Sequence, residues 1–137
     1  MRRLALGSLA VAVMALGACS SSGPKGPGPD PNIFPKDAHN EIINTLTTSL
    51  DDPTGIRQAF VTDPILRQAG QDQRYVVCMR FDARDINRQY TGVQERIAYF
   101  YAGHLNQLVK ADKGQCTGAP YRPWPELEKY CLAKNCR

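Results

Sequence analysis

The sequence contains few histidines, only a small excess of positive over negative charge, and a single long apolar run. Its 137 residues include two His, and Lys plus Arg outnumber Asp plus Glu by only 17 to 13. A nucleic-acid-binding domain is expected to carry a strongly basic face, so this balance argues against one. Only residues 4–16 form a long apolar stretch, which excludes a protein with several membrane-spanning helices. The length suits one domain with one core.

The motifs that assemble many catalytic sites are also missing from the sequence. The chain contains no Gly-x-Ser-x-Gly, His-Glu-x-x-His, Ser-x-x-Lys or glycine-rich phosphate loop. His39 is expected near a helix start and His104 in a turn, where histidine is more often a capping or solvated residue than a general base. Asp82 and Asp85 lie among basic residues, which favours surface ion pairs. The sequence therefore predicts no catalytic residue and no cofactor, and a small hydrolase using Asp82 or His104 is the least favoured alternative.

The N-terminus combines a basic start, a short apolar stretch and a cysteine. Arg2 and Arg3 precede residues 4–16, a stretch of thirteen residues that is too short to cross a bilayer comfortably. This pattern predicts a signal peptide over residues 1–18. Residues 16–19 read Leu-Gly-Ala-Cys and resemble the lipobox of bacterial lipoproteins.

The lipobox resemblance implies that Cys19 is the lipidated first residue of the mature protein. It implies diacylglycerol on the Cys19 sulfur, cleavage before Cys19, and acylation of the new amine. Three acyl chains exceed the two signals that stable membrane anchoring requires. The next residue is Ser20 and not Asp, which favours the outer membrane, facing the periplasm, over the inner membrane. The alternatives are an ordinary cleavage site beside a chance cysteine and an uncleaved anchor.

A segment rich in proline, glycine and serine separates Cys19 from the rest of the chain. Residues 20–35 contain five Pro, three Gly and three Ser. Such a composition buries too little apolar surface to offset chain entropy. Residues 19–35 are therefore predicted to form a disordered tether, which would reach roughly 50 Å in polyproline form. Residues 36–137 are then the single globular domain.

Hydrophobic periodicity in this domain predicts an α+β fold. Four apolar residues form one helical stripe and predict an N-terminal helix, capped by Asp37, over residues that include Ile42, Ile43, Leu46 and Leu50. β-rich stretches predict strands over residues 56–67, 73–84, 96–101 and 105–110, with a short helix at 126–134. Pro64 interrupts the first stretch, which indicates an edge strand or a bulge. Short connections favour an antiparallel meander. The expected architecture is the N-terminal helix packed on a curved antiparallel sheet of about four strands, with a short C-terminal helix.

Four cysteines remain once Cys19 is lipidated, and an even number in an exported small domain predicts two disulfides. Four cysteines allow three connectivities, of which we favour Cys78–Cys116 with Cys131–Cys136. The first bond would tie the central strand to the segment after the last strand. No C-x₂-C pair or nearby His completes a zinc site, so no metal is predicted. Four residues lie between Cys131 and Cys136, which argues against a thioredoxin-like redox motif.

Aromatic residues are the best indication of a binding surface. Tyr99 and Tyr101 share one face of a predicted strand, and Tyr121 and Trp124 lie in a proline-punctuated loop. Aromatic side chains at this density can anchor a protein partner or a sugar polymer. Packing against the sheet is the default interpretation for at least half of them.

Two further segments resemble a group of small, uncharacterised bacterial envelope proteins. Residues 52–57, Asp-Pro-Thr-Gly-Ile-Arg, are similar to that group's D-P-x-S-A-x-F/Y. Residues 77–92 are similar to V-C-x-x-F/V-N-A-K/R-N-x-x-G-x-Y-x-G, with Asp82 and Asp85 where the pattern has Asn. The resemblance implies no activity, so no binding or catalytic role is transferred. Asp82 and Asp85 are instead expected to cap backbone N–H groups in a polar turn.

The sequence thus predicts a non-catalytic lipoprotein of the bacterial envelope. Its expected partners are the lipid membrane, through acylated Cys19, and an envelope protein that it binds or helps to assemble into a complex. The alternative is a module that binds peptidoglycan or another polysaccharide through the four aromatic residues.

Overall fold

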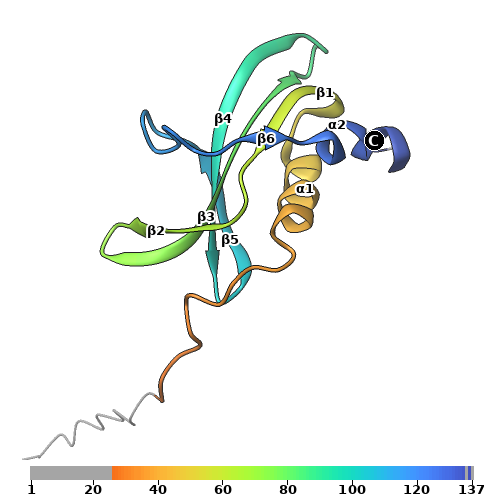
Figure 1. Cartoon of the computed structure of the whole chain (residues 1–137). Helices are drawn as coiled ribbons and strands as arrows, with labels where there is room; N and C mark the ends of the chain where they lie inside the picture. Colours follow the sequence, from red (N-terminus) through yellow and green to blue (C-terminus); the bar gives the residue numbers. More distant parts are fainter. Residues whose placement is uncertain (1–25, 135, 137) are drawn as a thin grey trace, which may run out of the picture.

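The computed structural model describes residues 26–134 and 136, which form two helices and one six-stranded sheet (Figure 1). The elements in chain order are α1 (Ala38–Ser49), β1 (Asp52–Val61), β2 (Ile65–Ala69), β3 (Asp72–Arg84), β4 (Tyr90–Tyr101), β5 (His104–Lys110), β6 (Arg122–Pro123) and α2 (Pro125–Lys134). Every pairing among the described strands is antiparallel. The sheet order is β5-β4-β3-β1-β6, and β2 also pairs with β3.

The expected α+β class is confirmed, whereas four strands is an undercount. Residues 56–67 contribute to both β1 and β2, and the expected interruption at Pro64 separates the two strands, because proline has no N–H for a ladder bond. β6 is a two-residue strand inside the proline-punctuated loop and pairs Arg122 with Val61. β4 also begins earlier than expected, at Tyr90.

The predicted signal peptide and Cys19 lie outside the described residues. Within residues 26–134 and 136, no helix is long and apolar enough to span a bilayer. Residues 31–35, which the sequence assigns to the tether, lie against the folded body. The Ala102 N–H donates to the Pro31 carbonyl over 3.1 Å, and the Phe34 ring meets Tyr75 edge-on, with centroids 5.3 Å apart.

β3 is the centre of the sheet because other strands pair with both of its sides. β2 pairs with its first half and β1 with its second half, while β4 pairs along most of its other side. Residues of β3 alternate as expected: Val77, Met79 and Phe81 join one buried cluster, and Val76 and Cys78 join another. The two faces of the sheet are therefore distinct.

The larger buried cluster lies under the two helices. α1 contributes the apolar stripe expected from the sequence, and α2 contributes Leu127. Asp37 is the N-cap residue, but its carboxylate accepts from the Asn40 side chain, 2.6 Å away, and not from a helix N–H. The capping bond expected of Asp37 is therefore not formed. The largest fully buried side chains in this core are Trp124, Phe81 and Phe100.

The opposite face carries a smaller cluster under the segment after β5. The described residues form two disulfides, with the pairing that we favoured. Cys78–Cys116 fixes this segment to the central strand, and Cys131–Cys136 links α2 to the residues that follow it. Val76 and Ile97 complete the buried part of the cluster. The Cys78–Cys116 disulfide thus cross-links this small core, in which few apolar side chains are buried.

Glutamates from the two helices protect the edges of the sheet. The Ala59 N–H of β1 donates to Glu128 of α2 over 2.9 Å, and the Leu105 N–H of β5 donates to Glu41 of α1. A β-bulge with a positive φ of 53° at Gln58 interrupts the β1–β3 register next to Ala59. Unpaired strand N–H groups are templates for another strand, so these contacts reduce edge-to-edge association.

Candidate functional site

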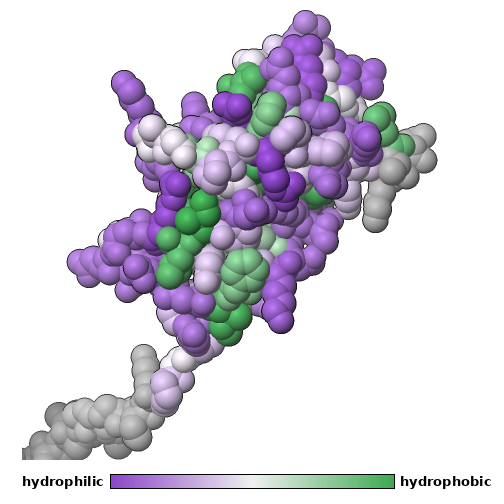
Figure 2. All heavy atoms as spheres, in the orientation of Figure 1, coloured by the Kyte–Doolittle hydropathy of each residue, from purple (hydrophilic) through white to green (hydrophobic). Residues whose placement is uncertain are grey.

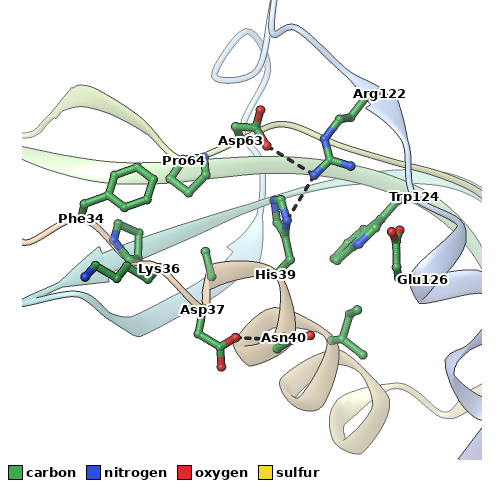
Figure 3. Close-up of a pocket in the computed structure, with 13 residues that line it drawn as sticks. Phe34, Lys36, Asp37, His39, Asn40, Asp63, Pro64, Arg122, Trp124 and Glu126 are labelled. Atoms are coloured by element: carbon green, nitrogen blue, oxygen red, sulfur yellow. Dashed lines mark hydrogen bonds and ion pairs between the residues drawn. The ribbon is translucent and has the colours of Figure 1, made fainter.

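A cavity of about 610 Å³ opens between the start of α1, the chain after β1 and the region of β6 (Figure 3). We call it the α1 pocket. Its lining combines apolar and charged side chains, among them Phe34, His39, Asp63, Pro64, Arg122 and Trp124. The chain places them together because α1 begins beside the end of β1, and β6 pairs with that same end of β1.

His39 is the centre of the polar side of the α1 pocket. Its Nε2 is 3.0 Å from the Thr62 carbonyl oxygen, and its Nδ1 is 3.3 Å from Nη2 of Arg122. A carbonyl only accepts and a guanidinium only donates, so these partners place the ring proton on Nε2. Nη2 of Arg122 also pairs with Asp63 over 3.3 Å (Figure 3). Arg122 thus links His39 to Asp63, and these contacts fix the orientation of the three side chains.

This arrangement suits binding better than proton transfer. Both ring nitrogens of His39 are already engaged. Among the described residues, none with a hydroxyl or thiol group lines the α1 pocket. A Ser, Thr or Cys nucleophile next to a base, the arrangement found in many hydrolases, is therefore not formed by this lining. The pocket instead offers an apolar wall and a rim of paired charges, which is the usual composition of a site that holds part of a partner molecule.

Trp124 lines this pocket from the core. The sequence offered Trp124 as part of an aromatic binding surface, with packing as the default for at least half of the four aromatics. Trp124 is one of those that pack, because only 1% of it is exposed. Its backbone N–H donates to the Ala59 carbonyl over 2.8 Å, directly after β6 has paired with β1. The indole ring lies 5.8 Å from the His39 ring, measured between centroids. Trp124 is therefore both a core residue and a wall of the pocket.

Tyr99 and Tyr101 lie on the other face of the sheet. Tyr99 lines a second cavity of about 410 Å³ together with amide side chains, including Gln107 and Gln115. The Gln115 amide donates to the Tyr99 hydroxyl over 3.2 Å. The Arg74 guanidinium lies 5.4 Å from the Tyr101 ring centroid. Tyr99 thus borders a polar cavity, whereas Tyr101 is exposed and contacts Arg74, which lines the same cavity.

Tyr121 lies on the same face as Tyr99 but is occupied by the fold. Its hydroxyl donates to Glu95 over 2.6 Å, and the Arg80 guanidinium lies 4.7 Å from its ring centroid. Burial raises the pKa of Tyr121, the bond to Glu95 and its negative charge raise it further, and the charges of Arg80 and Arg67 oppose the shift. The four aromatics predicted to form one surface are therefore divided between two faces.

Comparison of the chain with protein-family models, with curated proteins and with solved structures finds no match. In the part of the chain that the structure describes, no group of three or more His, Cys, Asp or Glu residues is placed to hold a metal ion.

Residues 52–57 and 77–92, the two segments singled out in the sequence, meet where β1, β3 and β4 lie side by side. Arg84 Nε is 3.0 Å from an Asp52 carboxylate oxygen, close enough for an ion pair although not aligned as a hydrogen bond. Arg84 also donates to the Thr54 carbonyl over 3.0 Å. Gly55 has a φ of +67°, and a Cβ there would lie 2.7 Å from Arg84 Nη2. The Tyr90 hydroxyl donates to the Gly55 carbonyl over 2.7 Å. These contacts give the two segments a structural role.

Asp82 and Asp85 cap backbone groups, as expected from the sequence. Asp85 accepts from the N–H groups of Asn87 and Gln89 over 2.8 and 2.9 Å. Asp82 accepts from the Gly92 N–H over 3.0 Å, and its other oxygen binds a guanidinium. Both carboxylates are engaged in holding the β3–β4 connection.

We expect acid titration to reveal the Asp52 interactions. Burial alone raises the pKa of Asp52, but hydrogen bonds from Thr54 and the charges of Arg84 and Arg88 outweigh it and hold the pKa below 3.8. A lowered folded-state pKa contributes stability above about pH 4 that is lost as the pH falls through the folded value. Asp52→Asn should therefore be less stable at neutral pH and lose less stability on acidification. Urea unfolding across pH measures this, and parallel curves for both proteins would contradict it.

Proposed function

We propose that the protein is a non-catalytic lipoprotein of the bacterial envelope, anchored through acylated Cys19, whose folded domain binds an envelope protein. The α1 pocket receives part of that partner. One observation carries the proposal: Phe34 and Ile33, adjacent in the chain, are 48% and 47% exposed, and Phe34 lines the pocket whose inner wall is Trp124. Figure 2 shows apolar surface gathered near the point where this N-terminal segment joins the body.

The composition of the α1 pocket supports a protein partner. Interfaces between proteins are built from apolar and aromatic anchors at the centre and a polar rim that excludes water. Here Phe34, Pro64 and Trp124 supply the apolar part, and Arg122 with Asp63 supplies part of the rim. A volume of about 610 Å³ accommodates a few side chains of a partner.

The position of the α1 pocket also suits an anchored protein. Residues 26–30 are exposed and lead to Pro31 and Phe34, which pack on the body beside the pocket. The pocket is therefore next to the end of the proposed tether. If Cys19 is anchored in the outer membrane, the tether connects this part of the domain to that membrane. A partner at or near the periplasmic surface of that membrane could then reach the pocket.

A polysaccharide-binding module is the second candidate function, and the second cavity favours it. Tyr99 lies there beside Asn106, Gln107 and Gln115. An aromatic ring with planar amide groups suits the apolar face and the hydroxyl groups of a sugar. Co-sedimentation with purified peptidoglycan sacculi tests this candidate: full retention of the full-length protein in the supernatant would remove it.

Cross-linking in intact cells, followed by mass spectrometry of what co-purifies with the tagged full-length protein, tests the main proposal. We expect one stoichiometric envelope protein, lost when Cys19→Ala abolishes anchoring. Phe34→Ala and Arg122→Ala should each reduce its recovery about fivefold or more, as for interface residues worth about 1 kcal/mol or more. Leu132→Ala is the matched control, because Leu132 is 74% exposed and does not line the pocket. Equal recovery with all three folded variants would contradict the proposal.

A further inference from the structure

The sheet face opposite the helices carries arginine and aromatic side chains next to one another. We define the arginine face as Arg57, Phe60, Arg80, Tyr90, Val93 and Tyr121. The strand register places them together, because Arg57 pairs with Asp82 and Asp82 with Val93, while Phe60 pairs with Arg80. Neither of the two cavities described above is lined by these residues.

Arg80 is held between two aromatic rings. Its guanidinium carbon is 4.7 Å from the ring centroid of Phe60 on one strand and 4.7 Å from that of Tyr121. Stacking on ring faces fixes the plane of the guanidinium and leaves its N–H groups at the edges. Within the described part of the chain, no acceptor forms a hydrogen bond or ion pair with the Arg80 side chain. Its donors are therefore oriented and unused.

The surroundings of Arg80 present cations and apolar groups to solvent. Arg57 stacks 3.6 Å from the Tyr90 centroid and keeps 53% of its side chain exposed, while its partner Asp82 is buried. Val93 is 54% exposed and Tyr90 is 40% exposed. Glu95, opposite Arg80 in the register, is the nearby carboxylate, and one of its oxygens already accepts from the Tyr121 hydroxyl.

We propose that the arginine face is a second interaction surface, which binds an acidic segment of a partner protein. A carboxylate of that segment would meet the edge of the Arg80 guanidinium, and apolar groups of the same segment would cover Tyr90 and Val93. Arginine and tyrosine are enriched at the energetic centres of protein interfaces, and a stacked guanidinium suits bidentate recognition of a carboxylate. Because this face is opposite the helices, the inference does not depend on the α1 pocket, and its failure would leave the pocket proposal intact.

Titration of the full-length protein, in neutral detergent at low ionic strength, with hexaglutamate and with hexalysine tests the inference. NMR follows both the affinity and the Arg80 Nε–H signal. Arg80→Ala should weaken hexaglutamate binding about tenfold, in line with one charge-assisted bond. Arg80→Lys should weaken hexaglutamate binding nearly as much. Lysine keeps the positive charge, but it lacks the planar guanidinium that binds a carboxylate through two N–H groups. Lys129→Ala, which removes an exposed cation on α2, should change it less than about twofold.

Three results would overturn the inference. Arg80→Lys could bind hexaglutamate as the unsubstituted protein does, which would show that charge alone is recognised. Lys129→Ala could weaken binding as much as Arg80→Ala, which would show attraction without a site. N-acetylmuramic acid, which carries a carboxylate on a sugar, could bind more tightly than hexaglutamate and point to a glycan. Near-ultraviolet circular dichroism establishes whether each variant is folded. If Arg80→Ala does not fold, the hexaglutamate affinity of Arg80→Lys tests the inference in its place.

Discussion

Replacing Trp124 with alanine is expected to lower the free energy of unfolding by about 3–5 kcal/mol, the usual cost of removing a large buried aromatic side chain. Trp124 is 1% exposed and belongs to the cluster that contains Phe81, Phe100 and Leu127. Its removal leaves a cavity between the sheet and the helices, next to the α1 pocket. For a domain of this size, the melting temperature should fall by about 10 °C or more. Urea and thermal unfolding of the purified protein measure both quantities.

Trp124→Phe is the matched control, because phenylalanine keeps an aromatic ring in the same space. It should cost clearly less than Trp124→Ala, since less volume is lost. If Trp124→Ala were nearly as stable as the unsubstituted protein and lost only its partner, Trp124 would be a surface anchor. That outcome would restore the interpretation suggested by the sequence and contradict the burial of this residue.

Removing the Cys78–Cys116 disulfide with a double alanine substitution is expected to destabilise the domain by about 4 kcal/mol in the chain-entropy model. The bond spans 38 residues and holds the segment after β5 against a small cluster. The same segment carries Tyr121, so the arginine face should also lose order. Chemical unfolding of the oxidised variant and of the unsubstituted protein measures the difference.

The second disulfide provides the comparison for the first. Cys131 and Cys136 are only five residues apart, and the same model gives about 2 kcal/mol for so short a loop. The Cys131→Ala, Cys136→Ala variant should therefore be the more stable of the two double variants. Equal stability of both would mean that loop closure does not govern their contributions. Unchanged melting of the unsubstituted protein on reduction would mean that neither bond contributes.

The parts of the fold that depend on local pattern could be predicted from the sequence. The apolar stripe through Ile42 and Leu46 identified α1, and alternation through Val77 and Met79 identified both faces of β3. The start of β1 was missed, because Asp52 followed by proline reads as the end of a helix. In the structure Asp52 begins the strand, where contacts from Arg84 and Thr54 hold it.

The α1 pocket could not be predicted, because its polar residues come from distant segments. His39 and Arg122 are 83 residues apart in the chain, and only the pairing of β6 with β1 brings them together. Whether Trp124 packs or is exposed could not be predicted for the same reason, since a two-residue strand has no periodicity to read. The pair Ile33 and Phe34, apolar residues at the end of a proline-rich segment, was the one local signal of this site.

The central claim is that the anchored domain binds an envelope protein at the α1 pocket, and a photo-cross-linking amino acid at position 34 of the full chain tests it most directly. The same residue at position 132, exposed and apolar but outside the pocket, is the control. On irradiation of living cells, we expect one discrete adduct of higher mass from position 34 and none from position 132. The same faint ladder of adducts from both positions, with the protein folded and membrane-bound, would contradict the claim.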